Sequence, residues 1–130
     1  MSDQDIETDI LAKGLTAPRI TLADIEAQIV GTYLFTAEQG ARAAINDDGA
    51  IGAGPLADEV PLGLLTICVL VLQNGFTVTG ESACASPENF DAEVGKKIAR
   101  SNAINKVWPL LGYQLRDSLH TAALEQRHAG

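Results

Sequence analysis

The sequence predicts an α+β fold. N-terminal helices are followed by a two-stranded antiparallel β-hairpin at about 64–84 and a long C-terminal helix at about 87–107, with a short helix after it. Three observations support this fold class. An Asn-Gly pair lies between two runs of strand-forming residues, apolar residues recur at helical spacing on both sides of these runs, and 130 residues is the length of one domain, here 1–130.

The first part of the chain is typical of helices. The segment DQDIETDILAKGL has apolar residues at helical spacing, and Thr21 is suited to cap a second helix. That helix should break near Gly31, because glycine weakens a helix and the following TYLF has strand-like composition. A further turn of helix is expected at 36–44.

Residues 46–61 are predicted to form a mobile loop. Glycines, prolines and four acids leave this segment little apolar surface with which to offset the entropy of ordering. The two ends of the chain, at about 1–18 and 120–130, are predicted to fray.

The Asn74-Gly75 pair predicts a two-residue type I′ turn, which sets the pairing of the hairpin strands. In that register Val71 faces Val78. One face of the hairpin then has the composition of a core surface. Its residues are Ile67, Val69, Val71, Phe76 and Val78.

The opposite hairpin face carries Cys68, Leu70 and Leu72, which would not normally point at water. Either the N-terminal helices or another copy of the chain should cover them. Because an isolated two-stranded hairpin is marginal and has two open edges, we expect the sheet to be completed or covered by homo-oligomerisation, with these three residues at the interface.

The long helix has a clear start signal, with Ser86 as its cap and Pro87 in its first turn. Its predicted end or kink is at Trp108, since the next residue is a proline. The apolar stripe expected to pack on the hairpin contains Phe90, Val94 and Ile98, with Ala99, Ala103, Ile104 and Val107 beside it.

The sequence offers little that could carry catalysis. His120 and His128 fall in the predicted frayed tail, far along the chain from the possible nucleophiles Ser82 and Cys84. Cys68 and Cys84 are interpreted as small hydrophobic residues. We therefore predict no catalytic residues, no cofactor and no metal site, and a protein that is not an enzyme.

One basic cluster is a candidate ligand site. Lys96 and Arg100 are one helical turn apart and Lys97 is adjacent, so three cations can point to one side and hold a phosphate or carboxylate. The alternative is a solvated helix face whose charge is balanced by Glu93.

The charge distribution limits the classes of partner. The net charge is −8, and residues 1–60 carry all of it, with 11 acids and 3 bases. Such acidity disfavours direct nucleic-acid binding and favours a basic partner. The apolar run 62–72 is too short for a membrane helix and no basic-apolar leader precedes the acidic start, so a soluble cytoplasmic protein with free thiols is expected.

The segments NGFTVTGESACASPENFDAE, GKKIAR and WPLLGY follow one another in the second half of the chain. Together they resemble the shared core of a family of small bacteriophage proteins found in a lytic coliphage, a Shigella podovirus and prophages. The upstream RITLADIEAQIVGTYLFTA is similar to the N-terminal helix of that family, so the resemblance spans most of Arg19 to Leu115. It implies an accessory protein in the host cell cytoplasm, but no reaction and no active-site residues.

Two classes of function fit these observations. The first is a non-enzymatic, anti-defence protein that binds and inhibits a host or defence component, in one version by sequestering a small anionic nucleotide. The alternative is an oligomeric structural or assembly protein of the phage particle.

Overall fold

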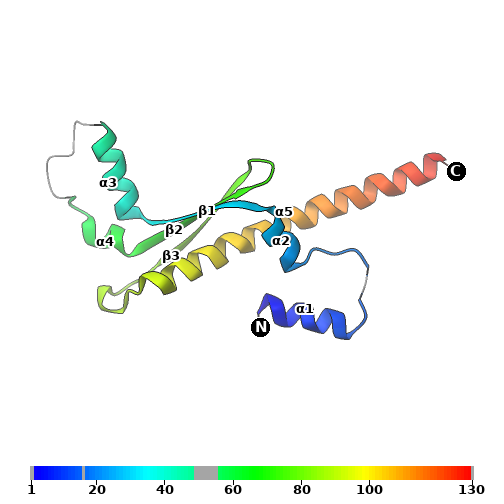
Figure 1. Ribbon diagram of the computed structural model, residues 1–130, viewed down its shortest axis with the longest axis horizontal. Helices are drawn as coiled ribbons and strands as arrows, with labels where there is room; N and C mark the ends of the chain where they lie inside the picture. Colours follow the sequence, from blue (N-terminus) through cyan, green and yellow to red (C-terminus); the bar gives the residue numbers. More distant parts are fainter. Residues whose placement is uncertain (1, 16, 49–55, 130) are drawn as a thin grey trace.

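The protein consists of a three-stranded antiparallel sheet and a long helix that lies across one face of it (Figure 1). The computed structural model describes residues 2–15, 17–48 and 56–129. The strands are β1 (Ile29–Thr36), β2 (Leu65–Leu72) and β3 (Thr77–Ala83), in that order across the sheet. The helices are α1 (Asp3–Ala12), α2 (Leu22–Gln28), α3 (Ala37–Asp48), α4 (Glu59–Gly63), the 3-10 turn η1 (Pro87–Asn89) and α5 (Ala92–Ala129). The predicted α+β class is confirmed.

The sheet has one strand more than the sequence predicted. Thr21 caps α2 reciprocally with Asp24, as expected, and the chain leaves the helix directly into β1. This strand pairs antiparallel with β2, with Tyr33 opposite Val69. The TYLF segment is therefore a strand that fills one edge of the hairpin, so the sheet is completed within the chain and does not need a second copy to become three-stranded.

The hairpin register differs by one residue from the prediction. The N–H of Leu72 donates to the Phe76 carbonyl at 2.9 Å and that of Gly75 to the Leu72 carbonyl at 2.8 Å. The loop thus has three residues, and Gly75 takes the left-handed conformation that such a loop requires, with φ of 88°. A one-residue change moves every side chain of a strand to the other face. Val78 therefore lies opposite Leu70 instead of Val71.

The core lies between the sheet and α5, on the face that was expected to need an external cover. Cys68 and Leu70 are 0% exposed and Leu72 is 5% exposed. Their cover is mainly the chain's own α5, with Ile25 of α2 in the same core. This corrects the predicted interface, because side chains already packed inside one chain are not available to a second copy. The remaining core residues are Val78, Ala99, Ala103, Ile104, Val107 and Leu111.

The α5 helix presents its small residues to the sheet. Gly95, Ala99 and Ala103 are buried, whereas Val94 and Ile98 are 51% and 45% exposed. The predicted stripe through Phe90, Val94 and Ile98 was wrong, and the residues named beside it form the buried face. A close approach of helix and strand selects small side chains over large ones.

Both ends of the predicted long helix differ in the structure. Asp91 caps α5, because its side chain accepts hydrogen bonds from the backbone of Glu93 and Val94 at 2.9 and 3.1 Å. Ser86 precedes only the turn η1 and makes no capping bond through its side chain. The helix runs through Pro109 as one element, since the buried residues Val107 and Leu111 hold the turns on either side of the proline.

The segments predicted to be mobile are helical in part. Of the loop 46–61, residues 49–55 lie outside the described residues, while α3 reaches Asp48 and α4 begins at Glu59. Within the two ends predicted to fray, at 1–18 and 120–130, the structure has α1 and the final part of α5, which projects beyond the sheet (Figure 1). Within the described ranges, no helix combines the length and the apolar character needed to cross a membrane.

Candidate functional site

The predicted basic cluster lies in the first turns of α5, but two of its cations already face carboxylates. The guanidinium of Arg100 donates to both carboxylate oxygens of Glu26 on α2, at 2.9 and 3.3 Å. This hydrogen bonding raises the pKa of Arg100 above its ordinary value. Lys96 Nζ lies 3.7 Å from Glu93 Oε1. An anion bound here would therefore compete with Glu26 for the guanidinium.

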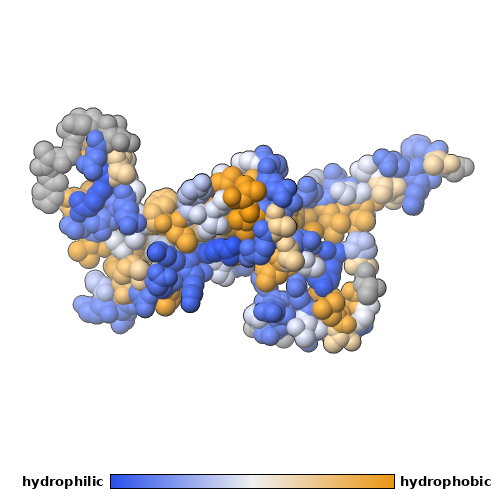
Figure 2. All heavy atoms as spheres, in the orientation of Figure 1, coloured by the Kyte–Doolittle hydropathy of each residue, from blue (hydrophilic) through white to orange (hydrophobic). Residues whose placement is uncertain are grey.

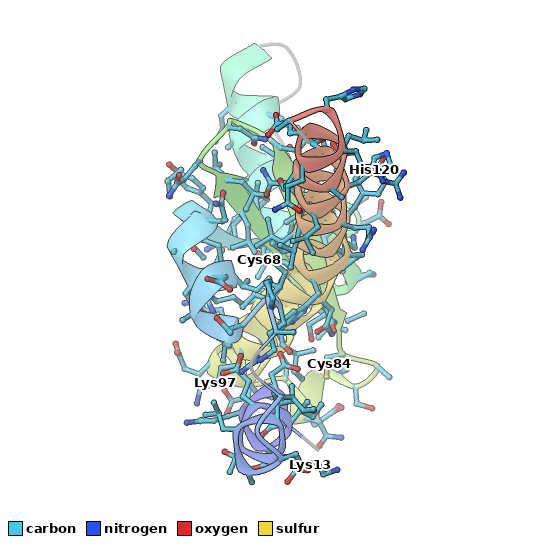
Figure 3. The ribbon with its side chains drawn as sticks, turned by 90° about the vertical axis from the view of Figure 1, so that its right-hand side faces the viewer. Lys13, Cys68, Cys84, Lys97 and His120 are labelled. Carbon is cyan, nitrogen blue, oxygen red and sulfur yellow. The ribbon has the colours of Figure 1, made fainter. Side chains whose placement is uncertain are left out.

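Lys97 is the exposed member of the cluster (Figure 3). In the described part of the chain it makes no ion pair, in contrast to Lys96 and Arg100. The structure thus places the three predicted residues on one helix, with Lys96 and Arg100 each beside a carboxylate, and the anion site remains a prediction.

The thiol of Cys68 lies inside the core, where the charge of Arg100 reaches it. Burial raises the pKa of this thiol, and the positive charge of Arg100 opposes the rise. Because the thiolate is the reactive form of cysteine, burial makes Cys68 a poor nucleophile. Its role is that of a small apolar residue, as the sequence indicated.

The outer face of the sheet, opposite α5, also carries apolar side chains. Among the described residues, no helix covers this face as extensively as α5 covers the inner one. Tyr33, Val69 and Thr79 lie in one row across the three strands, and Phe35 and Ile67 lie in the next. Tyr33 is 60% exposed. Ile67 and Val69 were predicted to lie on the core face of the hairpin, and β1 was not paired with it, so this exposed surface was not predicted.

A groove of about 540 Å³ lies where the hairpin turn meets α2 and α5. Its lining residues are Gln28, Leu72, Gln73, Asn74, Phe76, Leu110, Leu111 and Gln114. The Phe76 side chain is 55% exposed, and Figure 2 shows apolar atoms at the surface around the hairpin. Four amide side chains and one aromatic ring offer hydrogen bonds and a stacking surface to a flat polar ligand.

The groove walls are held in place by local bonds. Gln73 Nε2 donates to the carbonyl of Ala27 at 2.8 Å, and Asn74 Oδ1 accepts from the Phe76 N–H at 2.9 Å. The volume falls within the range of small-molecule sites, roughly 300–1,000 Å³. No single sequence motif signals this groove, because its residues come from three separate elements.

The chain matches the model of one known protein family. The model of the Phage protein (N4 Gp49/phage Sf6 gene 66) family matches residues 20–119. The chain belongs to this phage protein family. The resemblance seen in the sequence is confirmed. No curated protein and no solved structure gives a match.

The family match contains most of the features described above. The sheet, the Glu26–Arg100 pair and the groove all lie within residues 20–119 of this phage protein. The α1 helix and the last turns of α5 lie outside the match. The matched residues thus comprise the sheet with α2, α3, α4 and most of α5.

The candidate nucleophiles of this phage protein do not meet its histidines. Cys84 lines a small cavity beside Ile98 and donates from Sγ to the Ser86 carbonyl at 3.2 Å. His120 is farther along the same continuous α5, roughly 30 Å from Ile98 at ~1.5 Å per residue. Among the residues that the structure describes, no three metal-ligating side chains cluster.

Proposed function

We propose that this phage protein is a non-enzymatic accessory protein that acts in the infected bacterium by binding and inhibiting a host or defence component. The observation that carries the proposal is the groove at the hairpin turn, which has the size of a small-molecule site and is walled by three elements. A protein that binds a small signal tightly can inhibit the response to it by lowering its free concentration.

The ligand chemistry that fits is a small anionic nucleotide. A nucleobase could stack on Phe76 and bond to the amides of Gln28 and Gln114, which also line the groove. The nearest cations of the basic cluster lie on the same helix, but ~15 Å (Arg100) and ~20 Å (Lys97) along its axis from Leu110 of the groove, at ~1.5 Å per residue. Only an extended nucleotide with several phosphates could reach them from the groove, and Arg100 must first be released from Glu26.

Isothermal titration calorimetry with a panel of linear and cyclic nucleotides tests this version. We expect one class to bind, with Phe76→Ala and Gln114→Ala each weakening it by about ten-fold or more, equivalent to ~1.4 kcal/mol. Tyr113→Ala is the matched control, because Tyr113 is an exposed aromatic residue of α5 outside the groove. Absence of heat with every nucleotide would rule out sequestration, and co-purification from infected cells would then test for a protein target.

A second candidate is an oligomeric structural or assembly protein of the phage particle. The uncovered outer face of the sheet and the projecting end of α5 favour it, because both offer contact surface beyond one chain. Mass spectrometry of purified virions separates the two functions. A protein present in stoichiometric amounts in the particle would favour assembly, and its absence would favour the accessory role.

A further inference from the structure

The two free edges of the sheet are not equivalent. In the hairpin, Leu72 bonds to Phe76, and Cys84 donates to the Leu64 carbonyl at 3.0 Å. Since backbone groups alternate along an antiparallel strand, the even-numbered residues of β2 bond to β3 and the odd-numbered ones bond to β1. On β1 the partners of those odd-numbered residues include Tyr33, whose backbone N–H and carbonyl therefore point toward β2. Its neighbours Thr32 and Leu34 point their backbone groups the opposite way, toward the open edge.

The opposite edge, formed by β3, is protected. The carbonyl of Glu81 points outward and accepts a hydrogen bond from Asn102 Nδ2 of α5 at 2.8 Å. Glu81 also places a charge on this strand. A charged residue and a covering side chain are two ways in which proteins keep an edge strand from pairing with another chain.

The β1 edge lacks these devices. Its eight residues, IVGTYLFT, include no charged residue and no proline. The Thr36 N–H is used by Gln39 Oε1 at 2.9 Å, and the bulge at Val30 affects only the start of the strand. Among the described residues, the backbone groups of Thr32 and Leu34 make no hydrogen bond outside the sheet ladder. Such an edge is a template for strand addition.

We propose that the β1 edge binds the β1 edge of a second copy of this chain, in antiparallel register about Tyr33. Thr32 of each copy then pairs with Leu34 of the other. The outward N–H and carbonyl groups of these two residues are thereby satisfied on both strands. The two Tyr33 side chains meet on the outer face in a non-hydrogen-bonded pair, with Cα atoms ~4.5 Å apart. The result is one continuous six-stranded sheet.

A second copy is the occupant because this edge is complementary to itself. The outward backbone groups of Thr32 and Leu34 lie symmetrically about Tyr33, so one β1 strand offers its copy the donors and acceptors that the copy's own edge needs. The net charge of −8 on each chain opposes self-association, but β1 has no charged residue, so two copies can meet along it with little direct repulsion. The two-fold axis stands perpendicular to the sheet, so the exposed apolar rows of both copies join into one surface beside the paired Tyr33 residues.

Analytical ultracentrifugation of the full chain tests the proposal. We expect a species of twice the 13.7 kDa chain mass, or a multiple of it, in the wild type. Tyr33→Lys should convert it to a monomer, because two like charges would lie opposite each other. Thr79→Lys is the matched control, since Thr79 lies in the same row on β3, at the other edge. A monomeric wild type, or an assembly unchanged by Tyr33→Lys, overturns the proposal.

A cross-link provides a test that does not depend on the stability of the lysine variant. In a Cys84→Ser background, Tyr33→Cys should form a disulfide-linked dimer on mild oxidation, since ~4.5 Å between Cα atoms is within reach of a disulfide. Thr79→Cys should not. Equal cross-linking of the two variants would indicate random collision and would contradict the β1 pairing. Slow amide exchange at Thr32 and Leu34 in a monomer would also contradict it, because another segment would then occupy the edge.

Discussion

Gly80 of β3 lies directly against the backbone of Ala103 on α5. A Cβ atom at Gly80 would overlap the backbone nitrogen of Ala103 and the carbonyl oxygen of Ala99. The helix can therefore cover the sheet at this distance only if this position has no side chain. This contact sets which face of the hairpin is the core, and with it which surfaces remain for partners.

Gly80→Ala should destabilise the fold strongly. Backbone atoms cannot move aside as a flexible side chain can, so α5 must shift away from β3, and we expect a loss of roughly 2–4 kcal/mol in the free energy of unfolding by urea. Gly112→Ala, on α5, is the control glycine substitution. An added Cβ there meets nothing within 4 Å, so a gain of up to ~1 kcal/mol is expected. Equal small effects at both positions would contradict the close packing.

Pro109→Ala should stabilise the protein. Pro109 is exposed inside α5 and removes one helical hydrogen bond, which costs up to about 3 kcal/mol in a helix interior. We expect an increase of about 1–3 kcal/mol in the free energy of unfolding. A decrease would mean that the proline ring makes a packing contact that outweighs the lost hydrogen bond.

Glu26→Gln separates the structural and binding roles of Arg100. Both side chains of the pair are partly exposed, at 33% for Arg100 and 47% for Glu26, so the stability loss should be small, about 0–1 kcal/mol. If Arg100 binds the phosphates of a nucleotide, removing its competitor should tighten binding several-fold in calorimetry. Unchanged or weaker nucleotide binding would exclude Arg100 from the site.

Cys68 should be the less reactive thiol and should make stability depend on alkaline pH. Burial raises its pKa in the folded state above the ordinary value of 9.0. A raised pKa contributes stability that is complete below the unfolded-state pKa and is lost as pH rises toward the folded-state pKa. Stability should thus fall above about pH 9 in the wild type. Cys68→Ala should remove that dependence and Cys84→Ala should keep it, while a thiol reagent should modify Cys84 first.

The α1 helix should be a weakly attached addition. It has no buried residue, and it contacts the rest of the chain where Trp108 Nε1 donates to Asp3 Oδ2 at 3.3 Å and Glu7 lies 3.7 Å from Arg19. Removing residues 1–15 should shift the emission of the single tryptophan to longer wavelength and lower the free energy of unfolding by about 1 kcal/mol or less. Emission that does not change would show that α1 does not lie on Trp108 in solution.

Local signals in the sequence were sufficient for part of this fold. The Thr21 cap, the hairpin position and the long helix follow from short-range rules. The pairing of β1 with β2 does not, because Tyr33 and Val69 are far apart in sequence and any strand-like run could fill that edge. Asn74-Gly75 is compatible with loops of two or three residues, so the register could not be fixed from the turn alone.

The candidate site was harder to predict from the sequence than the fold was. Helical spacing placed Lys96 and Arg100 on one side of α5, but it could not show that Glu26 would arrive from α2 to pair with Arg100. The buried face of α5 was also mistaken, because hydrophobicity favours Val94 and Ile98 while the approach of Gly80 selects alanines. Contacts between distant elements decided both points.

Nuclear Overhauser contacts of the Gly80 α-protons test the central claim most directly, that α5 of the same chain covers the Cys68 and Leu70 face of the sheet. The structure predicts strong contacts from the Gly80 α-protons to Ala103 on α5. It also predicts a strong contact between the α-protons of Thr79 and Val69, which lie opposite each other in a non-hydrogen-bonded pair of the ladder. These contacts should persist between protons of one chain in isotope-mixed samples. A contact of the Thr79 α-proton to Leu70 in place of Val69, or contacts from Gly80 to Ala103 only between chains, would contradict the account.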